Sequence, residues 1–435
     1  MFLNSYLGGM KAIIPYMLLL SFVLLFNSCT RKKINASRAI GSVKDESEQS
    51  AKSMSNHEFS FLDDLVKGKR IVAVGESSHG IGEFYSLKTE MVKYLHQELG
   101  YQVLAMEGGY GDINLAWEQV DALDAKSLRD KTVFGNFKCE EVEPLFEYIK
   151  GQSLTNDPLF YTGYDCQTSS DLLADFLDTI VSSYNPAVAD SLTAAFGSYY
   201  QIYPSVYHPD STLYIYHTQR FLKAVSDVKH ILDQNAESIP SRFQLSDKEF
   251  NIINKSVGLF HKAIDIPYAD RLYNGNNFKG VLIRDQLMFQ NLKWLLENPY
   301  NQQKIILWAH NAHIQEAGIN GDSSKLMGQL LADEYGDDYV SIGLFAYQGR
   351  MYQHWTRDTV SFENSDTSFF EYQMMKYKKP YHFIDFTSSR DLDDNQWMFN
   401  EITALELENG GEVRFIPADR FDAAICIKEA DVPTF

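Results

Sequence analysis

The chain has 435 residues, of which 45% are hydrophobic, and it carries a formal net charge of −19 at pH 7. This length and apolar content are enough for one large or two ordinary folded domains with a substantial core. The strong negative charge argues against nucleic acid or anionic lipid as a partner, because both would be repelled.

The N-terminal residues resemble a secretion signal. Lys11 precedes an apolar run from Ala12 to Phe26, which has signal-peptide length and is too short for a comfortable transmembrane helix. The run is followed by Ser28 and Cys29, and a small residue before cysteine resembles a bacterial lipoprotein cleavage box. We therefore expect a location in the cell envelope through a lipid anchor alone, with a signal peptide over 1–28, lipidation at Cys29 and a flexible polar tether over 29–57.

The folded part begins with a strand that ends in two titratable residues. Ile71–Val74 is a short, β-branched run without alternation, which is typical of a strand buried on both faces of a parallel sheet. Gly75 ends it, and Glu76 and His79 follow on a turn before an amphipathic helical pattern that stops at Gly100. Open α/β sheets bind ligands at such carboxyl ends of strands.

Further strand ends repeat this plan. Polar residues follow three more buried runs, which are 102–106 before Glu107, 159–164 before Asp165, and 304–309 before His310, Asn311 and His313. Asp112 is expected to cap the helix after the second strand. Strand patterns return at 339–345, 382–385 and 423–427. Strands alternating with helices predict an α/β fold with a mainly parallel sheet flanked by helices.

Between the third and fourth of these strands the pattern becomes helical. Amphipathic segments follow one another at 171–184, 218–235, 247–264 and 281–297. We expect a helical insertion over 169–300 that covers the carboxyl ends of the strands, on a catalytic core formed by 58–168 and 301–435. The alternative is ordinary helical packing, in which the many tyrosines of this segment have no ligand role.

Titratable side chains at four successive strand ends would converge on one rim of a parallel sheet, and that convergence predicts an active site. Its candidate members are Glu76, His79, Glu107, Asp165, His310 and His313. Taken singly, each residue has a structural alternative. Glu76 could cap the next helix, Glu107 could accept backbone donors, and either histidine of the fourth strand end could be a satisfied core residue.

The sequence contains no motif for a nucleophilic side chain, which favours water as the nucleophile. The Gly-x-Ser-x-Gly elbow of α/β hydrolases is absent, and Ser77 and Ser78 lack its context. A histidine could take a proton from water, while Glu76 or Glu107 fixes its tautomer. Arg284 lies on a predicted amphipathic helix, where an arginine is normally solvated or salt-bridged. Facing a cleft rich in carboxylates, it could instead hold an oxyanion.

A metal site is the competing use of the same residues, since clusters of Glu and His bind Zn, Mn or Fe. However, Glu76-x-x-His79 is not the His-Glu-x-x-His of zincins, which needs both histidines on one helix. Cys139, Cys166 and Cys426 show no CxxC spacing, so neither a disulfide framework nor a zinc knuckle is indicated. We expect an enzyme without a cofactor, although a divalent metal is possible. The alternative is a lipid-anchored envelope protein that binds a metal or haem through the same Glu and His residues.

Together these motifs resemble the erythromycin esterase family over residues 58–427. The resemblance rests on Gly-Glu76-x-x-His79-Gly with downstream Glu83 and Lys88, on a strand ending in Glu107, on Arg284-Asp-x-x-Met, and on Trp-Ala-His310-Asn311-x-His313. It implies an α/β core with a helical insertion over a wide cleft. It also implies hydrolytic opening of a macrolide lactone of the erythromycin type by an activated water, without a covalent intermediate or an obligatory cofactor, and hence a role in antibiotic resistance.

The resemblance also implies a role for each site residue. His79 would be the general base, with Glu76 and Glu107 as carboxylate partners and Arg284 holding the substrate or the oxyanion. The remaining assignments are His310 and His313 in the catalytic set and Lys88, Asn311 and Asp165 in substrate binding. The expected partner is a small-molecule ester or lactone; no oligomeric state is predicted.

Overall fold

The computed structural model describes residues 59–206, 211–272, 278–317, 325–354, 356–375, 380–388, 393–406 and 411–435. The expected signal peptide, Cys29 and the tether lie outside these residues. Within the described ranges, no helix is both long and apolar enough to cross a membrane.

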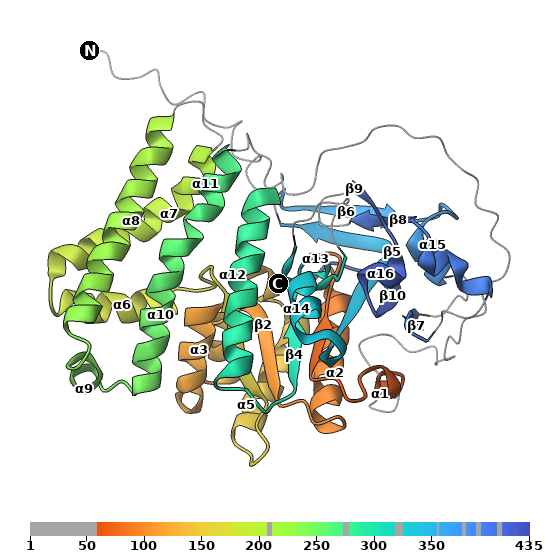
Figure 1. Cartoon of the computed structure of the whole chain (residues 1–435), viewed down its shortest axis with the longest axis horizontal. Coiled ribbons are helices and arrows are strands. Elements are labelled where there is room, and N and C mark those ends of the chain that lie inside the picture. Colours follow the sequence, from red (N-terminus) through yellow and green to blue (C-terminus); the bar gives the residue numbers. More distant parts are fainter. Residues whose placement is uncertain are drawn as a thin grey trace.

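One large sheet organises the molecule (Figure 1). Its strands lie in the order β3-β2-β4-β1-β5-β10-β7, and β6 pairs with the far end of β5. The strands from β3 to β10 run parallel, whereas β7 and β6 are antiparallel to their neighbours. The prediction of a mainly parallel sheet is therefore confirmed. The bounds are β1 (Ile71–Val74), β2 (Val103–Gly109), β3 (Phe160–Asp165), β4 (Ile305–Trp308), β5 (Tyr339–Gln353), β6 (Asp358–Glu363), β7 (Tyr381–Asp385) and β10 (Ala423–Ala430).

The register of the central strands brings their carboxyl ends together. Val74, the last residue of β1, pairs with Trp308, the last residue of β4, and Trp308 also pairs with Met106 of β2. All residues of β1, β2 and β4 are buried, which explains why these runs are apolar without alternation. The segments that follow the three strands consequently leave the sheet at the same level of one edge.

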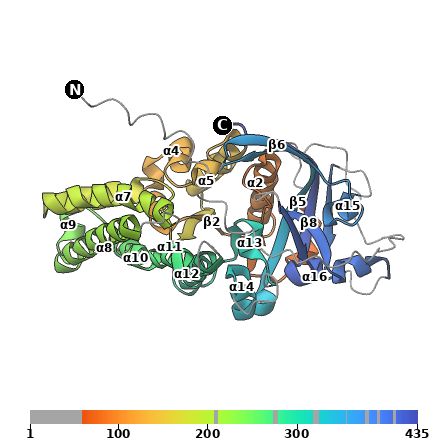
Figure 2. The same cartoon turned by 90° about the horizontal axis from the view of Figure 1, so that it is seen from above.

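Helices cover both faces of the sheet (Figure 2). On one face α2 (Gly82–Gln97) contacts α5 (Glu143–Ser153), and on the other α12 (Phe278–Glu297) contacts α14 (Met327–Tyr335). Shorter helices fill the connections near the strand ends. They are α1 (Leu62–Leu65), α3 (Tyr110–Glu118), α4 (Ala125–Asp130) and α13 (Asn311–Ile314).

A block of helices lies beside the β3 edge (Figure 1). It packs on the core through α3, which contacts both α6 and α10, and α12 then returns along β3. The four predicted helical segments are helical, and α7, which lies inside the expected helical block, was not among the segments named. The assignment of residues 169–300 as a separate insertion stays a prediction. The helices of the block are α6 (Leu172–Ser182), α7 (Pro186–Val206), α8 (Ser211–Gln234), α9 (Ile239–Phe243), α10 (Asp247–Ala263) and α11 (Asp265–Leu272).

The C-terminal third contains structure that the sequence did not predict. β5 continues to Gln353, well past the expected end near 345, and forms a long hairpin with β6. A second two-stranded sheet pairs β8 (Ile402–Glu406) with β9 (Gly411–Phe415). The short helices α15 (Phe370–Met374) and α16 (Pro417–Arg420) complete this part of the fold.

The expected role of Asp112 as the cap of its own helix is wrong. The helix α3 begins at Tyr110, so Asp112 lies inside its first turn. Its fully buried carboxylate accepts hydrogen bonds from the backbone N–H groups of Ser169 and Leu173, at 2.9 and 3.0 Å, and so caps the start of α6 instead. Tertiary contact, rather than local sequence, decides which helix end this carboxylate serves.

Candidate active site

The turn after β1 is packed tightly against the turn after β4. A side chain on Gly75 would place its Cβ 2.0 Å from Oδ1 of Asn311, so only glycine fits there. The N–H of Asn311 donates to the backbone carbonyl of Glu76 at 2.8 Å. This close approach joins the two strand ends that carry Glu76 and His79 on one side and His310 and His313 on the other.

His79 has one ring nitrogen held by a carboxylate. Its Nδ1 lies 3.1 Å from Oε1 of Glu76, whose side chain is fully buried, while the His79 side chain is 20% exposed. A carboxylate can only accept, so Nδ1 carries the proton and the neutral ring has its lone pair on Nε2. His79 is thereby poised as a base, with Glu76 ready to stabilise the imidazolium.

Lys88 holds the other oxygen of Glu76. Its Nζ pairs with Oε2 of Glu76, donates to the carbonyl of Ala309 at 3.2 Å, and lies 4.2 Å from the ring centre of Trp308. Burial lowers the pKa of Lys88 to about 8, although the Glu76 carboxylate acts to raise it. These contacts orient Glu76 and the end of the strand before His310. The Lys88 side chain is completely buried, so it does not contact a substrate.

His310 has the opposite tautomer to His79. It is the N-cap of α13, where its Nδ1 accepts a hydrogen bond from the N–H of Ala312 at 3.1 Å. Nδ1 is therefore unprotonated, and the neutral ring carries its proton on Nε2. The ring centres of His310 and His79 are 5.1 Å apart. His79, which has a lone pair on Nε2, thus lies beside His310, which has a proton on Nε2.

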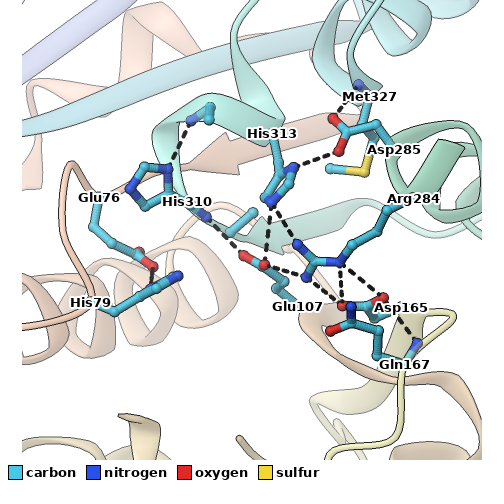
Figure 3. A network of polar contacts seen from close by, with 12 residues as sticks. Glu76, His79, Glu107, Asp165, Gln167, Arg284, Asp285, His310, His313 and Met327 are labelled. Carbon is cyan, nitrogen blue, oxygen red and sulfur yellow. Dashed lines mark hydrogen bonds and ion pairs between the residues drawn. The ribbon is translucent and has the colours of Figure 1, made fainter. Parts of the chain in front are cut away.

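Arg284 joins two strand ends through their carboxylates (Figure 3). Its guanidinium contacts both oxygens of Asp165, with Nε at 3.2 Å from Oδ2, and its Nη2 lies 2.8 Å from Oε1 of Glu107. The second oxygen of Glu107 accepts from the backbone N–H of His310 at 3.0 Å. Burial acts to raise the pKa of Glu107, but His313, Arg284 and His79 outweigh it and hold that pKa well below its usual range.

His313 lies between two carboxylates. Its Nδ1 is 2.8 Å from Oδ1 of Asp285, and its Nε2 is 3.4 Å from Oε1 of Glu107. Burial acts to lower the pKa of His313, but Asp285 and Glu107 outweigh it and raise the pKa to about 10. A protonated His313 donates through both nitrogens, so Arg284 Nη1, at 3.1 Å from Nε2, is a second cation beside Glu107 and not a donor to the ring.

We expect His313 to stay protonated through neutral pH. Its folded pKa lies above the ordinary 6.5, so its contribution to the free energy of unfolding is complete below pH 6.5 and is lost as the pH rises toward 10. Asp285→Asn removes the main cause, and ¹⁵N NMR should then detect loss of the ring proton at a lower pH. A His313 ring that is neutral in the wild type at pH 7 would contradict this assignment. Stability should be compared below about pH 7, where Lys88, with a pKa of about 8, is still largely protonated.

Three residues expected to bind substrate are used inside the protein. Lys88 is fully buried, and Asp165, 1% exposed, is held by Arg284. The amide of Asn311 donates to the carbonyl of Leu344 at 2.9 Å and accepts from its N–H at 3.2 Å, which ties the turn after β4 to β5. These contacts are typical of residues that hold the catalytic side chains in position and do not themselves bind substrate.

Sequence reasoning missed three residues that support the site. Asp285, next to Arg284 on α12, fixes His313 and also accepts from the N–H of Met327 at 2.8 Å. Tyr85 and His354 both contact the backbone carbonyl of His79, the latter through Nε2 at 3.1 Å. The adjacent Arg and Asp were a signal for Asp285, whereas the extension of β5 that leads to His354, in the turn after Gln353, was not expected.

No thiol in the described part of the chain is suited to nucleophilic attack. Cys139, Cys166 and Cys426 are all buried and unpaired with one another. Burial raises the pKa of Cys139 to about 12 and that of Cys166 and Cys426 well above the usual range. Among the described residues, no three His, Cys, Asp or Glu side chains are arranged so that they could hold a metal ion.

Comparison with known proteins identifies similar sequences. A family model described as erythromycin esterase matches residues 96–430. The protein YbfO of Bacillus subtilis (strain 168), which is named provisionally as a hydrolase, is 27% identical to this chain over 377 residues. The match covers 82% of each of the two chains. Erythromycin esterase type II of Escherichia coli is 26% identical over 306 residues, or 67% of this chain and 72% of that protein. Glu76 and His79 precede the segment matched by the family model.

Solved structures share the fold. A protein from Bacillus cereus superposes with a TM-score of 0.63 at 20% sequence identity, covering 88% of this chain and 94% of that one. An erythromycin esterase mutant in its open conformation superposes with a TM-score of 0.60 at 16% identity, covering 88% and 96%. The α/β architecture is therefore common to these proteins.

Proposed function

This chain belongs to the erythromycin esterase family and is a hydrolase, and from that membership we propose that it hydrolyses carboxylic esters or lactones with water as the nucleophile. The name of the Escherichia coli relative makes a macrolide lactone the candidate substrate. No cofactor is proposed. Lipidation at Cys29 and an envelope location remain predictions from the sequence, because that residue lies outside the described part of the chain.

The observation that carries the proposal is the pair of contacts at His79 Nδ1 and His310 Nδ1, from which we infer opposite tautomers for the two rings. Nε2 of His79 accepts a proton from water while the water oxygen attacks the carbonyl carbon of the ester. Glu76, 3.1 Å from Nδ1, stabilises the imidazolium that forms. The tetrahedral intermediate then expels the alkoxide, which takes the proton back from His79, so one acid and one alcohol are formed from one ester and one water.

The oxyanion of the intermediate requires a donor. We propose Nε2–H of His310 for this role, because its ring centre lies 5.1 Å from that of His79; Nε2 itself is buried, so the ester oxygen has to reach it from the side of His79. A single donor of this kind contributes about 10²–10³-fold to a rate. Arg284 was the earlier candidate for this role, but its guanidinium already holds Asp165 and Glu107, so we propose that it positions the site instead.

The alkaline limit of activity should report the Lys88–Glu76 pair. Lys88, with a pKa of about 8, loses its charge above that pH and no longer holds Glu76 as an ion pair. We expect kcat/KM to fall above about pH 8, and in Lys88→Arg to stay level over at least about one further pH unit, because a guanidinium remains protonated. An unchanged alkaline limb in a folded Lys88→Arg variant would remove this residue from the mechanism.

The reaction itself is tested by mass spectrometry. Protein beginning near Asn35 is incubated with erythromycin and with a panel of lactones and aryl esters, in the presence and absence of a chelator. The proposal predicts a product heavier by one water from a lactone, or the free acid and alcohol from an ester, unaffected by chelation. Absence of any product across the panel would refute the ester hydrolase, and loss of product with chelator would point to the metal alternative.

A further inference from the structure

The candidate active site carries an excess of negative charge. Four carboxylates that are at most 4% exposed stand against three cations, which leaves one net negative charge when His79 and His310 are neutral. If His313 gives up its proton, the excess becomes two. The carboxylates are those of Glu76, Glu107, Asp165 and Asp285, and the cations are Lys88, Arg284 and His313.

No cation of the described site is available to an anionic substrate. Arg284 is the most exposed of the three, with 18% of its side chain accessible, and it already contacts Asp165 and Glu107. Its pKa is raised well above the usual range by these two carboxylates, in spite of burial, which is the mark of a cation that is fully compensated. The other two cations are buried against carboxylates of their own.

We propose that this site takes esters or lactones whose body is neutral or cationic and discriminates against anionic ones. The inference rests on the proposed hydrolase function and adds the charge class of its substrate. One net charge about 8 Å away, at an effective dielectric constant of about 20, changes binding by roughly 30-fold. The net charge of −19 on the chain acts in the same direction at longer range.

The same excess of charge suits the chemistry. During attack by water, His79 becomes positive as the ester oxygen becomes negative, so the negative surroundings stabilise the imidazolium. The oxyanion must then be met by a neutral donor, which is the part given to His310. A substrate that already carries a carboxylate near the scissile bond would enter this field against repulsion from the start.

Three matched compounds test the inference. They share chain length and end in tert-butyl, trimethylammonium or carboxylate groups, and each is made as a nitrophenyl ester for turnover and as the amide for binding by calorimetry. Kd of the anionic amide should exceed that of the neutral one by at least about 10-fold at low ionic strength, and the gap should narrow with added salt. Equal or tighter binding of the anion, or no binding of any amide, would overturn the inference.

A charge-changing variant sharpens the test. Asp165→Asn removes one negative charge and leaves Arg284 partly uncompensated, so the gap between the neutral and anionic amides should shrink to a few-fold. Asp227→Asn, in an exposed ion pair with Lys223 on α8, is the matched control and should leave the gap unchanged. An unchanged gap in a folded Asp165→Asn variant would overturn the inference. Selective binding of the amides without cleavage of any ester would refute the proposed hydrolysis alone.

Discussion

His79→Asn should lower kcat/KM for a cleaved ester by about 10²–10⁴-fold, the usual contribution of a general base. Asparagine can keep a hydrogen bond to Glu76 but has no lone pair of useful basicity at the position of Nε2. The side chain is partly exposed at a turn, so its replacement leaves the core intact. The measurement is the steady-state rate of hydrolysis of the same ester by both proteins, at a pH between 7 and 8.

His230→Asn is the matched control, because His230 lies exposed on α8, away from the strand ends. It should retain the wild-type rate, and both variants should show the wild-type unfolding transition. Activity of His79→Asn within a few-fold of the wild type would exclude His79 as the base and would move that role to another group at the strand ends.

Arg284→Met should destabilise the fold by about 3–5 kcal/mol, because it leaves the buried carboxylate of Asp165 without its cation and Glu107 with His313 alone. Glu107 and Asp165 are 4% and 1% exposed, and Arg284 is the residue that bridges them. Methionine restores the apolar stem but no donor. The free energy of unfolding is measured by denaturant titration at pH 7, where both carboxylates would have to remain charged or take up protons.

Adding Asp165→Asn to Arg284→Met should recover part of the loss, since the carboxylate that has lost its cation is then removed. Arg414→Met provides the control, because Arg414 pairs with Glu401 on the surface, where both side chains are more than half exposed. It should hardly change the unfolding midpoint. Equal stability of Arg284→Met and the wild type would mean that this buried network does not hold the strand ends together.

The part of the fold that could be predicted is the part governed by local pattern. Ile71–Val74 was bounded correctly because both faces of the strand are buried, so its residues are apolar without exception. The convergence of Glu76, Glu107 and His310 could be predicted as well, because the carboxyl ends of parallel strands necessarily share one edge. The strand expected at 382–385 is β7, but its antiparallel pairing, the strand β6 and the extension of β5 depend on pairing partners that local pattern does not specify.

Partner choice within the site could not be predicted, since it depends on distances between segments far apart in the chain. The sequence left open whether Glu76 or Glu107 serves His79; the structure pairs His79 with Glu76 and gives Glu107 to Arg284 and His313. The solvent exposure of the site residues could not be predicted either. A lysine near an active site suggests contact with substrate, and only the fold reveals that Lys88 is completely buried.

Direct attack by water is the central claim, and the mass of the intact protein during turnover tests it most directly. Samples quenched in acid while an ester is being cleaved are analysed by mass spectrometry, and a slow ester is included so that deacylation would limit the rate. The account predicts that the protein keeps its unmodified mass at every time point while acid and alcohol accumulate. A species heavier by the acyl group, formed and lost at the rate of turnover, would contradict it, because a side chain would then be the nucleophile.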